Sequence, residues 1–476
     1  MTALMVQGTS SWAGKSLITT ALCRHFARRG VRVAPFKAQN MSNNARVVAG
    51  GEIGTAQWLQ ALAARVEPEV RMNPVLVKPE GDTRSQVVVR GVADPVLTAL
   101  PWRERTPVLW PVVAECLASL LREFDLIVLE GAGSPAEINL ADCDMTNLRS
   151  AATADASVLL VCDIDRGGAF AHLYGTWALL GAADRERIRG FVLNRFRGDA
   201  ALLADAPERL TALTGVPLAG VVPWLAHGLP DEDGVAPPNP SSAPTTDRPS
   251  SGTAASDPDE FAPPAVAIVT YPTASNLDEF KPLEQVARVR YARAPSELAG
   301  ADLVVLPGSK HVAADLRWLR GNGFVPAVRA APRVLGICGG LQMLGRRLEG
   351  EDGLGLLPLT TTFACEKLVE RAEVRFSPAL GDWHPLAGLP VRGYEIRHGR
   401  TRADEPVAEA LPGGRGWVRG GVLGVTLHGL FENPDVVAAL AGRAPARSLD
   451  AAIDELTDGV VAALDIDLVE RLAGCR

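Results

Sequence analysis

The sequence alternates short runs of apolar, often β-branched residues with longer stretches of helical pattern, and this alternation constrains the fold more than any other feature. Strands that are apolar along their whole length are typical of parallel sheets covered on both faces by helices. The chain is therefore predicted to be an α/β protein, without internal repeats. The expected strands include residues 4–7, 31–34, 126–129, 158–161, 191–193, 266–269 and 303–306.

A segment at 231–265 divides this pattern into two halves. It is rich in Pro, Ser, Thr, Ala and Asp and has almost no large apolar residues. Because such a segment buries too little apolar surface to offset the entropy cost of ordering it, we expect a mobile linker. The length of 476 residues also exceeds one ordinary core. We therefore expect a domain at 1–230, the linker at 231–265 and a second domain at 266–476, each with a mainly parallel sheet.

Composition and charge exclude several classes of function. The formal net charge of -7 argues against general nucleic-acid binding, which requires a basic surface. No run of about 18 apolar residues is present, so no membrane-spanning helix is expected. The N-terminus lacks the pattern of a secretion signal. The seven cysteines are scattered and form no C-x-x-C pair, which favours a reducing cytoplasm over a zinc site or a disulfide framework.

A candidate nucleophile lies in the second half of the chain. Cys338 stands in Gly-Ile-Cys-Gly-Gly (336–340), directly after an apolar run, where a strand is predicted to turn sharply into a helix. A lone cysteine is more often an inert core residue. Here, however, His428 follows a further apolar strand and can act as the base that a thiolate needs. The amides at Gly308, in a Pro-Gly turn, and at Gly339 are candidate oxyanion donors.

A candidate phosphate-binding loop lies in the first half. Residues 8–16 (Gly-Thr-Ser-Ser-Trp-Ala-Gly-Lys-Ser) follow a predicted strand and precede a predicted helix. Loop amides and the helix N-terminus would receive phosphate oxygens, Lys15 would neutralise charge on the transferred phosphate, and Ser16 would reach Mg²⁺. Five residues separate Gly8 from Gly14, one more than the standard motif has. A chance glycine loop is the alternative, which the flanking strand and helix disfavour.

Polar residues follow other predicted strands of the first half. Glu130 directly follows the strand predicted at 126–129. Enzymes with a phosphate-binding loop of this kind hold their metal ion with an acid at the carboxyl end of a buried strand, so Glu130 is predicted to bind Mg²⁺. A helix-capping role is the alternative. The loop 37–44 carries Lys37 and several amide side chains, including Asn40. It is suited to binding carboxylate or phosphate oxygens, although Asn and Ser are also ordinary turn residues.

The second half resembles the class I (triad) glutamine amidotransferases between residues 266 and 432. The resemblance is carried by the turn at Cys338, the Pro-Gly turn and the late His428. Those enzymes usually have a glutamate two residues after the histidine, where this chain has Leu430. Glu432 and Glu395 are possible substitutes. In having a Cys-His pair without a third member, this half of the chain resembles the cobyric acid synthase branch of the family.

The longer loop of the first half resembles that of dethiobiotin synthetase and its relatives, which activate carboxylates. Taken together, the segments resemble the cobyric acid synthase family over nearly the whole chain apart from the linker. The Asn-rich loop favours this family over the cobyrinic acid a,c-diamide synthases. The segments that carry the resemblance are 7–11, 14–16, 37–44, 165–168, 194–199, 393–396 and 427–433.

The resemblance implies ATP- and glutamine-dependent amidation of the b, d, e and g carboxylates of adenosylcobyrinic acid a,c-diamide through acyl phosphates, with Mg²⁺ accompanying ATP. The implied partners are small molecules: a corrinoid, glutamine and ATP. Two alternatives remain, namely a related ligase such as the a,c-diamide synthase and a P-loop switch of the partitioning-ATPase type. Such switches carry a signature lysine where this chain has Ser10. The implied roles are catalysis for Cys338 and His428, ATP binding for Gly8, Thr9, Gly14, Lys15, Ser16 and Asn194, substrate binding for Lys37 and Asn40, and Mg²⁺ binding for Ser16 and Glu130.

Overall fold

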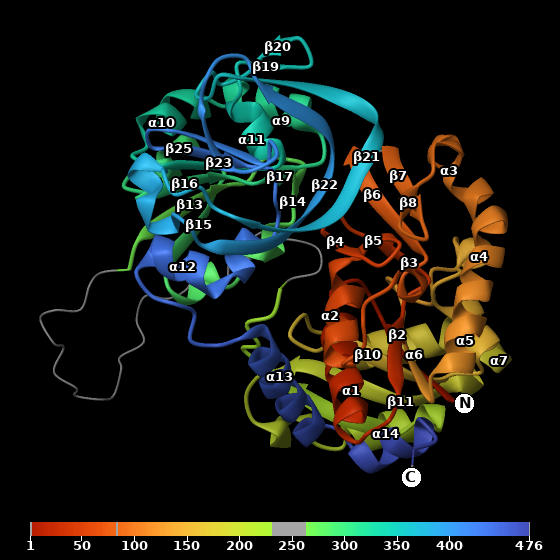
Figure 1. Cartoon of the computed structure of the whole chain (residues 1–476). Coiled ribbons are helices and arrows are strands. Elements are labelled where there is room, and N and C mark those ends of the chain that lie inside the picture. The colour runs from red at the N-terminus through yellow and green to blue at the C-terminus, as the bar shows by residue number, and fades with distance from the viewer. Residues whose placement is uncertain (1, 82–83, 231–262, 476) are drawn as a thin grey trace, which may run out of the picture. The chain divides into compact units, whose positions relative to one another are not determined.

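The computed structural model describes residues 2–81, 84–230 and 263–475 (Figure 1). Two compact units divide the chain, one comprising Met1–Glu232 with Arg447–Arg476 and the other Asp233–Ala446. Each unit contains a mainly parallel sheet with helices packed on it, which confirms the predicted α/β class. The predicted linker at 231–265 lies outside the described residues except for its last three, and Ala265 already begins a strand.

The first unit is built on a six-stranded parallel sheet with the order β12-β11-β10-β1-β9-β2. Every strand predicted for this half is found in it. Because all its strands are parallel, their carboxyl ends lie along one edge, where ligands bind in such folds. The strands are β1 (Thr2–Gly8), β2 (Val33–Phe36), β9 (Leu126–Glu130), β10 (Ser157–Asp163), β11 (Ile188–Phe196) and β12 (Leu218–Pro223).

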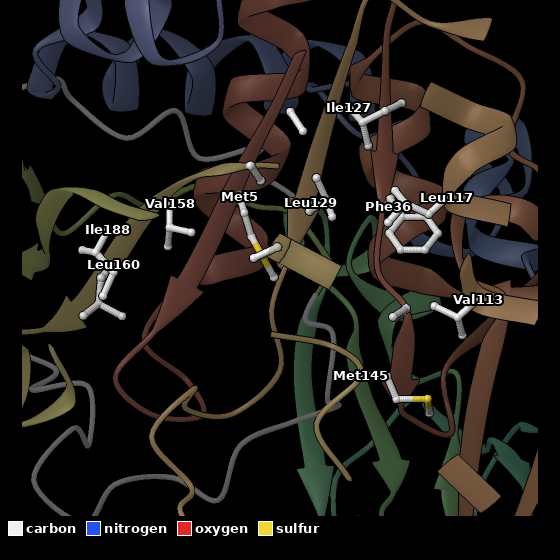
Figure 2. Packing of buried hydrophobic residues seen from close by; sticks show 14 of the residues in the cluster. Met5, Phe36, Val113, Leu117, Ile127, Leu129, Met145, Val158, Leu160 and Ile188 are labelled. Carbon is white, nitrogen blue, oxygen red and sulfur yellow. The ribbon is translucent and has the colours of Figure 1, made fainter. Parts of the chain in front are cut away.

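Helices cover both faces of this sheet, as alternate residues of β1 show. Met5 belongs to one hydrophobic core, whereas Leu4 and Val6 belong to the other. Figure 2 shows part of the first core, to which the longest helix contributes Val113 and Leu117. The helices of this unit are α1 (Lys15–Arg28), α2 (Thr55–Ala63), α3 (Pro95–Ala99), α4 (Trp102–Glu123), α5 (Leu148–Ala154), α6 (Ala169–Leu179), α7 (Ala182–Arg187), α8 (Ala206–Thr214), α13 (Leu449–Ala463) and α14 (Ile466–Leu472).

The position of α13 and α14 corrects the predicted domain at 266–476, because both helices belong to the first unit. α13 lies beside α1 (Figure 1), and its Ile453 and Leu456 complete the core on that face of the sheet. Arg28 of α1 adds an ion pair of 2.7 Å to Asp454 of α13. α13 therefore covers α1, the helix that follows the phosphate-binding loop, and shields it from solvent.

Two smaller sheets complete the first unit and hold the loop at 37–44. A four-stranded sheet has the order β3-β6-β7-β8, and a two-stranded hairpin leads into α2. These elements lie between β2 and α4 in sequence, and the chain enters them from the carboxyl end of β2. Their strands are β3 (Gln39–Met41), β4 (Ala45–Val48), β5 (Gly51–Gly54), β6 (Val75–Gly81), β7 (Arg84–Val89) and β8 (Val92–Ala93).

The second unit has a seven-stranded sheet with the order β15-β13-β16-β18-β25-β24-β23. Its first five strands are parallel, while β24 and β23 are added antiparallel. The strands predicted at 266–269 and 303–306 correspond to β13 and β16. The strands of the sheet are β13 (Ala265–Val269), β15 (Arg288–Ala292), β16 (Leu303–Leu306), β18 (Val334–Ile337), β23 (Ala408–Leu411), β24 (Gly416–Arg419) and β25 (Val422–Val425).

Helices and a long antiparallel pair surround this second sheet. The pair β21 (Leu359–Arg375) and β22 (Pro390–Ala403) runs side by side along most of its length. Short strands and helices connect the strands of this unit, and Cys338 and His428 lie just after β18 and β25. These further elements are β14 (Ala274–Ser275), η4 (Leu277–Phe280), β17 (Gly308–Ser309), α9 (Val312–Gly321), α10 (Phe324–Ala330), α11 (Gly339–Leu344), β19 (Arg347–Leu348), β20 (Glu351–Asp352), η8 (Leu430–Glu432) and α12 (Pro434–Ala441).

None of the helices in the described part of the chain has both the length and the apolar character that crossing a bilayer requires.

Candidate functional sites

Cys338 occupies the sharp turn between β18 and α11, as predicted from the sequence. Its backbone has φ 49° and ψ -104°, which is strained for a residue that carries a side chain. The turn is held by a hydrogen bond of 2.8 Å from the Cys338 amide to Val425 O. Gly340 allows the following helix to approach β16, because a Cβ there would lie 1.9 Å from Leu306 O. Close backbone packing therefore fixes the thiol at the end of the sheet.

His428 follows β25 and reaches the same place. Its ring lies close enough to Cys338 for the charge of the sulfur to act on the imidazole. On the other side, its Nδ1 lies 3.0 Å from Oε1 of Glu279. Both His428 and Glu279 are buried, at 2% and 0% exposure. The structure thus brings the two predicted catalytic residues together and adds a carboxylate to them.

The surroundings of His428 raise the pKa of its imidazole to about 10. Burial alone would lower this pKa, because it disfavours the charged ring. The negative charges of Cys338 and Glu279, together with the hydrogen bond to Glu279, outweigh burial. The imidazole is therefore held protonated at neutral pH between a sulfur and a carboxylate, the arrangement of an activated thiol.

The carboxylate beside His428 is neither of the two that the sequence suggested. Glu395 is buried between two guanidinium groups, with 2.7 Å to Nε of Arg397 and 3.1 Å to Nε of Arg415. Glu432 is exposed. Glu279 lies 149 residues before His428 in the chain, and no local motif connects them. Although Leu430 stands where the usual glutamate would be, the Cys338–His428 pair has an acidic neighbour in Glu279.

The two glycines predicted to form an oxyanion site both lie against this centre. A Cβ on Gly308 would lie 2.6 Å from Cε1 of His428, and a Cβ on Gly339 would lie 2.7 Å from the amide nitrogen of Ser309. Glycine is thus required at both positions by the close approach of neighbouring atoms. That their amides receive an oxyanion stays a prediction.

In the first unit, the loop 8–16 joins β1 to α1 as predicted. Gly14 adopts φ 97°, and a Cβ on it would lie 1.9 Å from Nδ2 of Asn194. That amide nitrogen donates to Ala13 O at 2.9 Å, so Asn194 of β11 holds the loop where it enters α1. Lys15 Nζ donates to Ser10 O at 3.0 Å and to Gly133 O at 3.2 Å. The structure therefore gathers most of the predicted ATP-binding residues around one loop.

Thr9 is placed differently from the other predicted ATP-binding residues. Its amide donates to Val161 O at 2.9 Å, which continues the ladder between β1 and β10. The amide of Thr9 is therefore already used by β10, and a phosphate contact by its hydroxyl stays a prediction.

Glu130, at the end of β9, is the centre of a buried polar cluster. Its Oε1 accepts from Ser16 Oγ at 2.9 Å and from Lys37 Nζ at 2.8 Å. Its Oε2 accepts from Nε2 of Gln60, in α2. The predicted metal-binding residues Ser16 and Glu130 are therefore adjacent. Lys37, predicted to bind substrate, lies on the same carboxylate.

α2 connects this cluster with the other predicted substrate-binding residue. Asn40 Nδ2 donates to Oε1 of Gln57 at 3.2 Å, one turn before Gln60 on the same helix. Gln57 Nε2 and Gln60 Oε1 are buried and have no hydrogen-bond partner among the described residues. Because a buried polar atom without a partner is costly, these two atoms favour a ligand here. The sequence did not point to either glutamine, since neither belongs to a recognisable motif.

The residues around Glu130 suit Mg²⁺ bound together with a nucleotide. A hydroxyl and a carboxylate are the hard oxygen ligands that Mg²⁺ prefers. Within the described residues, no group of three or more His, Cys, Asp or Glu side chains could hold a metal ion. The ion would therefore depend on phosphate and water for its remaining ligands, as Mg²⁺ commonly does.

Comparison with known proteins assigns a family to each part of the chain. Residues 4–228 match the CobQ/CobB/MinD/ParA nucleotide binding domain, and residues 265–436 match the CobB/CobQ-like glutamine amidotransferase domain. The first match spans the Gly14 loop and Glu130, and the second spans Glu279, Cys338 and His428.

Curated relatives match nearly the whole chain. A cobyric acid synthase of Polaromonas sp. is 53% identical, with 96% of this chain and 95% of that relative covered. The cobyric acid synthase of Variovorax paradoxus is 55% identical, with 96% of each chain covered, and that of Paracidovorax citrulli is 54% identical over the same shares. With both domain types present in one chain at this identity, the chain belongs to the cobyric acid synthase family.

Proposed function

We propose that this protein uses ATP and glutamine to convert the b, d, e and g carboxylates of adenosylcobyrinic acid a,c-diamide into amides, giving adenosylcobyric acid in cobalamin biosynthesis. The observation that carries the proposal is the presence of two distinct centres in one chain. One is a cysteine paired with a protonated histidine, and the other is a phosphate-binding loop beside a buried carboxylate. The name shared by the curated relatives supports the corrinoid substrate.

In the second unit, the Cys338 sulfur attacks the amide carbon of glutamine and forms a thioester. His428 donates its proton to the departing nitrogen, so that ammonia leaves. Water then attacks the thioester, which releases glutamate and restores the thiol. The raised pKa of His428 supports this assignment, because the imidazole must carry the proton when the nitrogen departs.

In the first unit, a corrin carboxylate attacks the γ-phosphate of ATP, which forms an acyl phosphate and releases ADP. Ammonia then attacks the acyl carbon, phosphate leaves, and an amide remains. Lys15, fixed by two carbonyls at the mouth of the loop, neutralises charge on the transferred phosphate. Lys37 and Asn40 hold the substrate carboxylate near Glu130. The unpartnered atoms of Gln57 and Gln60 support a ligand at this place.

Ser16 and Glu130 would hold Mg²⁺ with the phosphates of ATP. Bound there, the ion would neutralise negative charge on the phosphates. The hydroxyl and the carboxylate are already 2.9 Å apart, which supports this assignment.

Mass spectrometry of the corrinoid product tests the proposal. Adenosylcobyrinic acid a,c-diamide is incubated with the protein, ATP, Mg²⁺ and glutamine, and we expect four successive exchanges of hydroxyl for amino. Cobyrinic acid, offered in parallel, distinguishes the a,c-diamide synthase reaction. Amidation of cobyrinic acid but not of its a,c-diamide would contradict the proposed substrate.

A further inference from the structure

Glu279 contacts the segment that carries His428 at two points. Its Oε1 accepts from Nδ1 of His428 at 3.0 Å, and its Oε2 accepts from the amide of Gly429 at 2.8 Å. Both oxygens of one carboxylate are thus used by two consecutive residues. The carboxylate is completely buried, so no solvent competes for these bonds.

Core packing places Glu279 against this segment. Glu279 lies in η4, whose Leu277 and Phe280 belong to the hydrophobic core of the second unit. The Phe280 ring packs on Phe431 of η8, with 5.4 Å between centroids. Since η8 begins two residues after His428, the carboxylate and the imidazole are held on two segments that pack against each other.

The remaining sides of the imidazole are also fixed. The ring of Tyr394 stacks on it, with 5.5 Å between centroids and 23° between planes. The backbones of Tyr394 and His428 exchange two hydrogen bonds, of 3.1 and 2.9 Å. With Nδ1 bonded to Glu279, Nε2 is the nitrogen left for Cys338. The titratable groups around the ring, among the described residues, are Cys338, Glu279, Tyr394 and, beside Gly429, Glu432.

We propose that Glu279 is the positioning residue of the glutamine-hydrolysing centre, supplied from η4 in place of a glutamate close after the histidine. It holds the proton on Nδ1, so that Nε2 faces the sulfur and passes its proton to the departing ammonia. Its negative charge stabilises the imidazolium. This inference rests on the proposed function, since it concerns the same reaction.

Replacement by glutamine separates positioning from packing, because Glu279→Gln keeps the size of the side chain. The amide has only one acceptor oxygen, whereas both neighbours of Glu279 are donors. One N–H of the pair must therefore face an NH₂ group. The charge that stabilises the imidazolium is lost as well.

Glutamine-dependent and ammonium-dependent amidation are compared in wild type, Glu279→Gln and the control Glu432→Gln. We expect Glu279→Gln to lower the glutamine-dependent kcat on the order of 100-fold. The ammonium-dependent rate should match wild type, because the first unit is unchanged. Glu432→Gln, which removes an exposed acid close to the same histidine, should retain both activities. Wild-type glutamine-dependent kcat in folded Glu279→Gln would overturn the inference.

The pH dependence of Cys338 alkylation by iodoacetamide gives a readout that packing alone does not move. Loss of the Glu279 charge makes the imidazolium easier to deprotonate. The change in alkylation rate that accompanies its deprotonation should therefore move to lower pH in Glu279→Gln. An unchanged transition would overturn the inference. Ammonium-dependent amidation by wild type keeps this test separate from the proposed function, whose failure would abolish that reaction as well.

If Glu279→Gln does not fold, Glu279→Asp carries the test. It keeps the charge but withdraws the carboxylate by one carbon, so we expect a glutamine-dependent kcat about 10-fold below wild type, with normal use of ammonium. Undiminished use of glutamine by folded Glu279→Asp would contradict a positioning role.

Discussion

The centre at Cys338 and the centre at Glu130 differ in what holds their reactive groups. Around Cys338 the backbone positions the reactive group, because a strained turn and close-packed glycines bring the thiol to His428. Around Glu130 side chains do so, since Ser16, Lys37 and Gln60 from separate elements converge on one carboxylate. Backbone geometry can be recognised in a short sequence motif, whereas a convergent network of side chains cannot. The two centres should also fail in different ways.

Lys15→Ala should have the largest effect, because it removes the cation that both nitrogen sources require. We expect amidation with glutamine and with ammonium to fall together by about 1000-fold or more. Product mass spectrometry with each nitrogen source measures the effect. Far-UV circular dichroism confirms that the variant is folded. Persistence of either reaction at the wild-type rate would show that the loop is not the phosphate site.

Cys338→Ala should abolish amidation with glutamine but not amidation with ammonium. Without the sulfur no thioester forms, so the glutamine-dependent rate should fall by about 1000-fold, while added ammonium restores amidation. The matched control is Cys365→Ala, which removes an exposed cysteine of the same unit. If Cys338→Ala used glutamine as well as the control, the assignment of the nucleophile would be wrong.

Glu130→Gln should lower stability as well as activity, which distinguishes the charged cluster from the backbone-built centre. The change leaves the Lys37 ammonium buried without its carboxylate. We expect a loss of about 3 kcal/mol in the free energy of unfolding of the first unit, measured by urea denaturation. Asp125→Asn, which breaks an exposed pair with Arg32, should have little effect. Equal effects of both changes would contradict a buried, strongly coupled cluster.

The smallest expected effect concerns the pH dependence of the second unit. Folding raises the pKa of His428 from its ordinary 6.5 to about 10. The protonated imidazole therefore stabilises the fold fully below pH 6.5, and this contribution is lost as the pH rises toward 10. Thermal unfolding of wild type and His428→Gln between these values should show a steeper decline in wild type. Parallel declines would contradict a histidine held protonated by its neighbours.

The sequence was sufficient to predict the parallel sheets, because apolar strands alternate clearly with helices. It also located Cys338, whose flanking glycines show the turn. It did not reveal the domain to which α13 and α14 belong, since an apolar helix face does not specify the surface that it covers. Glu279 was missed for a related reason: its contact with His428 spans 149 residues and depends on the packing of η4 against η8.

Transfer of nitrogen between the two centres is tested most directly with glutamine labelled with ¹⁵N in its side-chain amide. The labelled glutamine, ATP and Mg²⁺ are incubated with the protein and adenosylcobyrinic acid a,c-diamide, and the corrinoid is weighed. We predict that every new amide carries the label, that omission of ATP prevents its appearance, and that Cys338→Ala with unlabelled ammonium gives unlabelled amides. Hydrolysis of glutamine without ATP-dependent appearance of the label in the corrinoid would contradict the account.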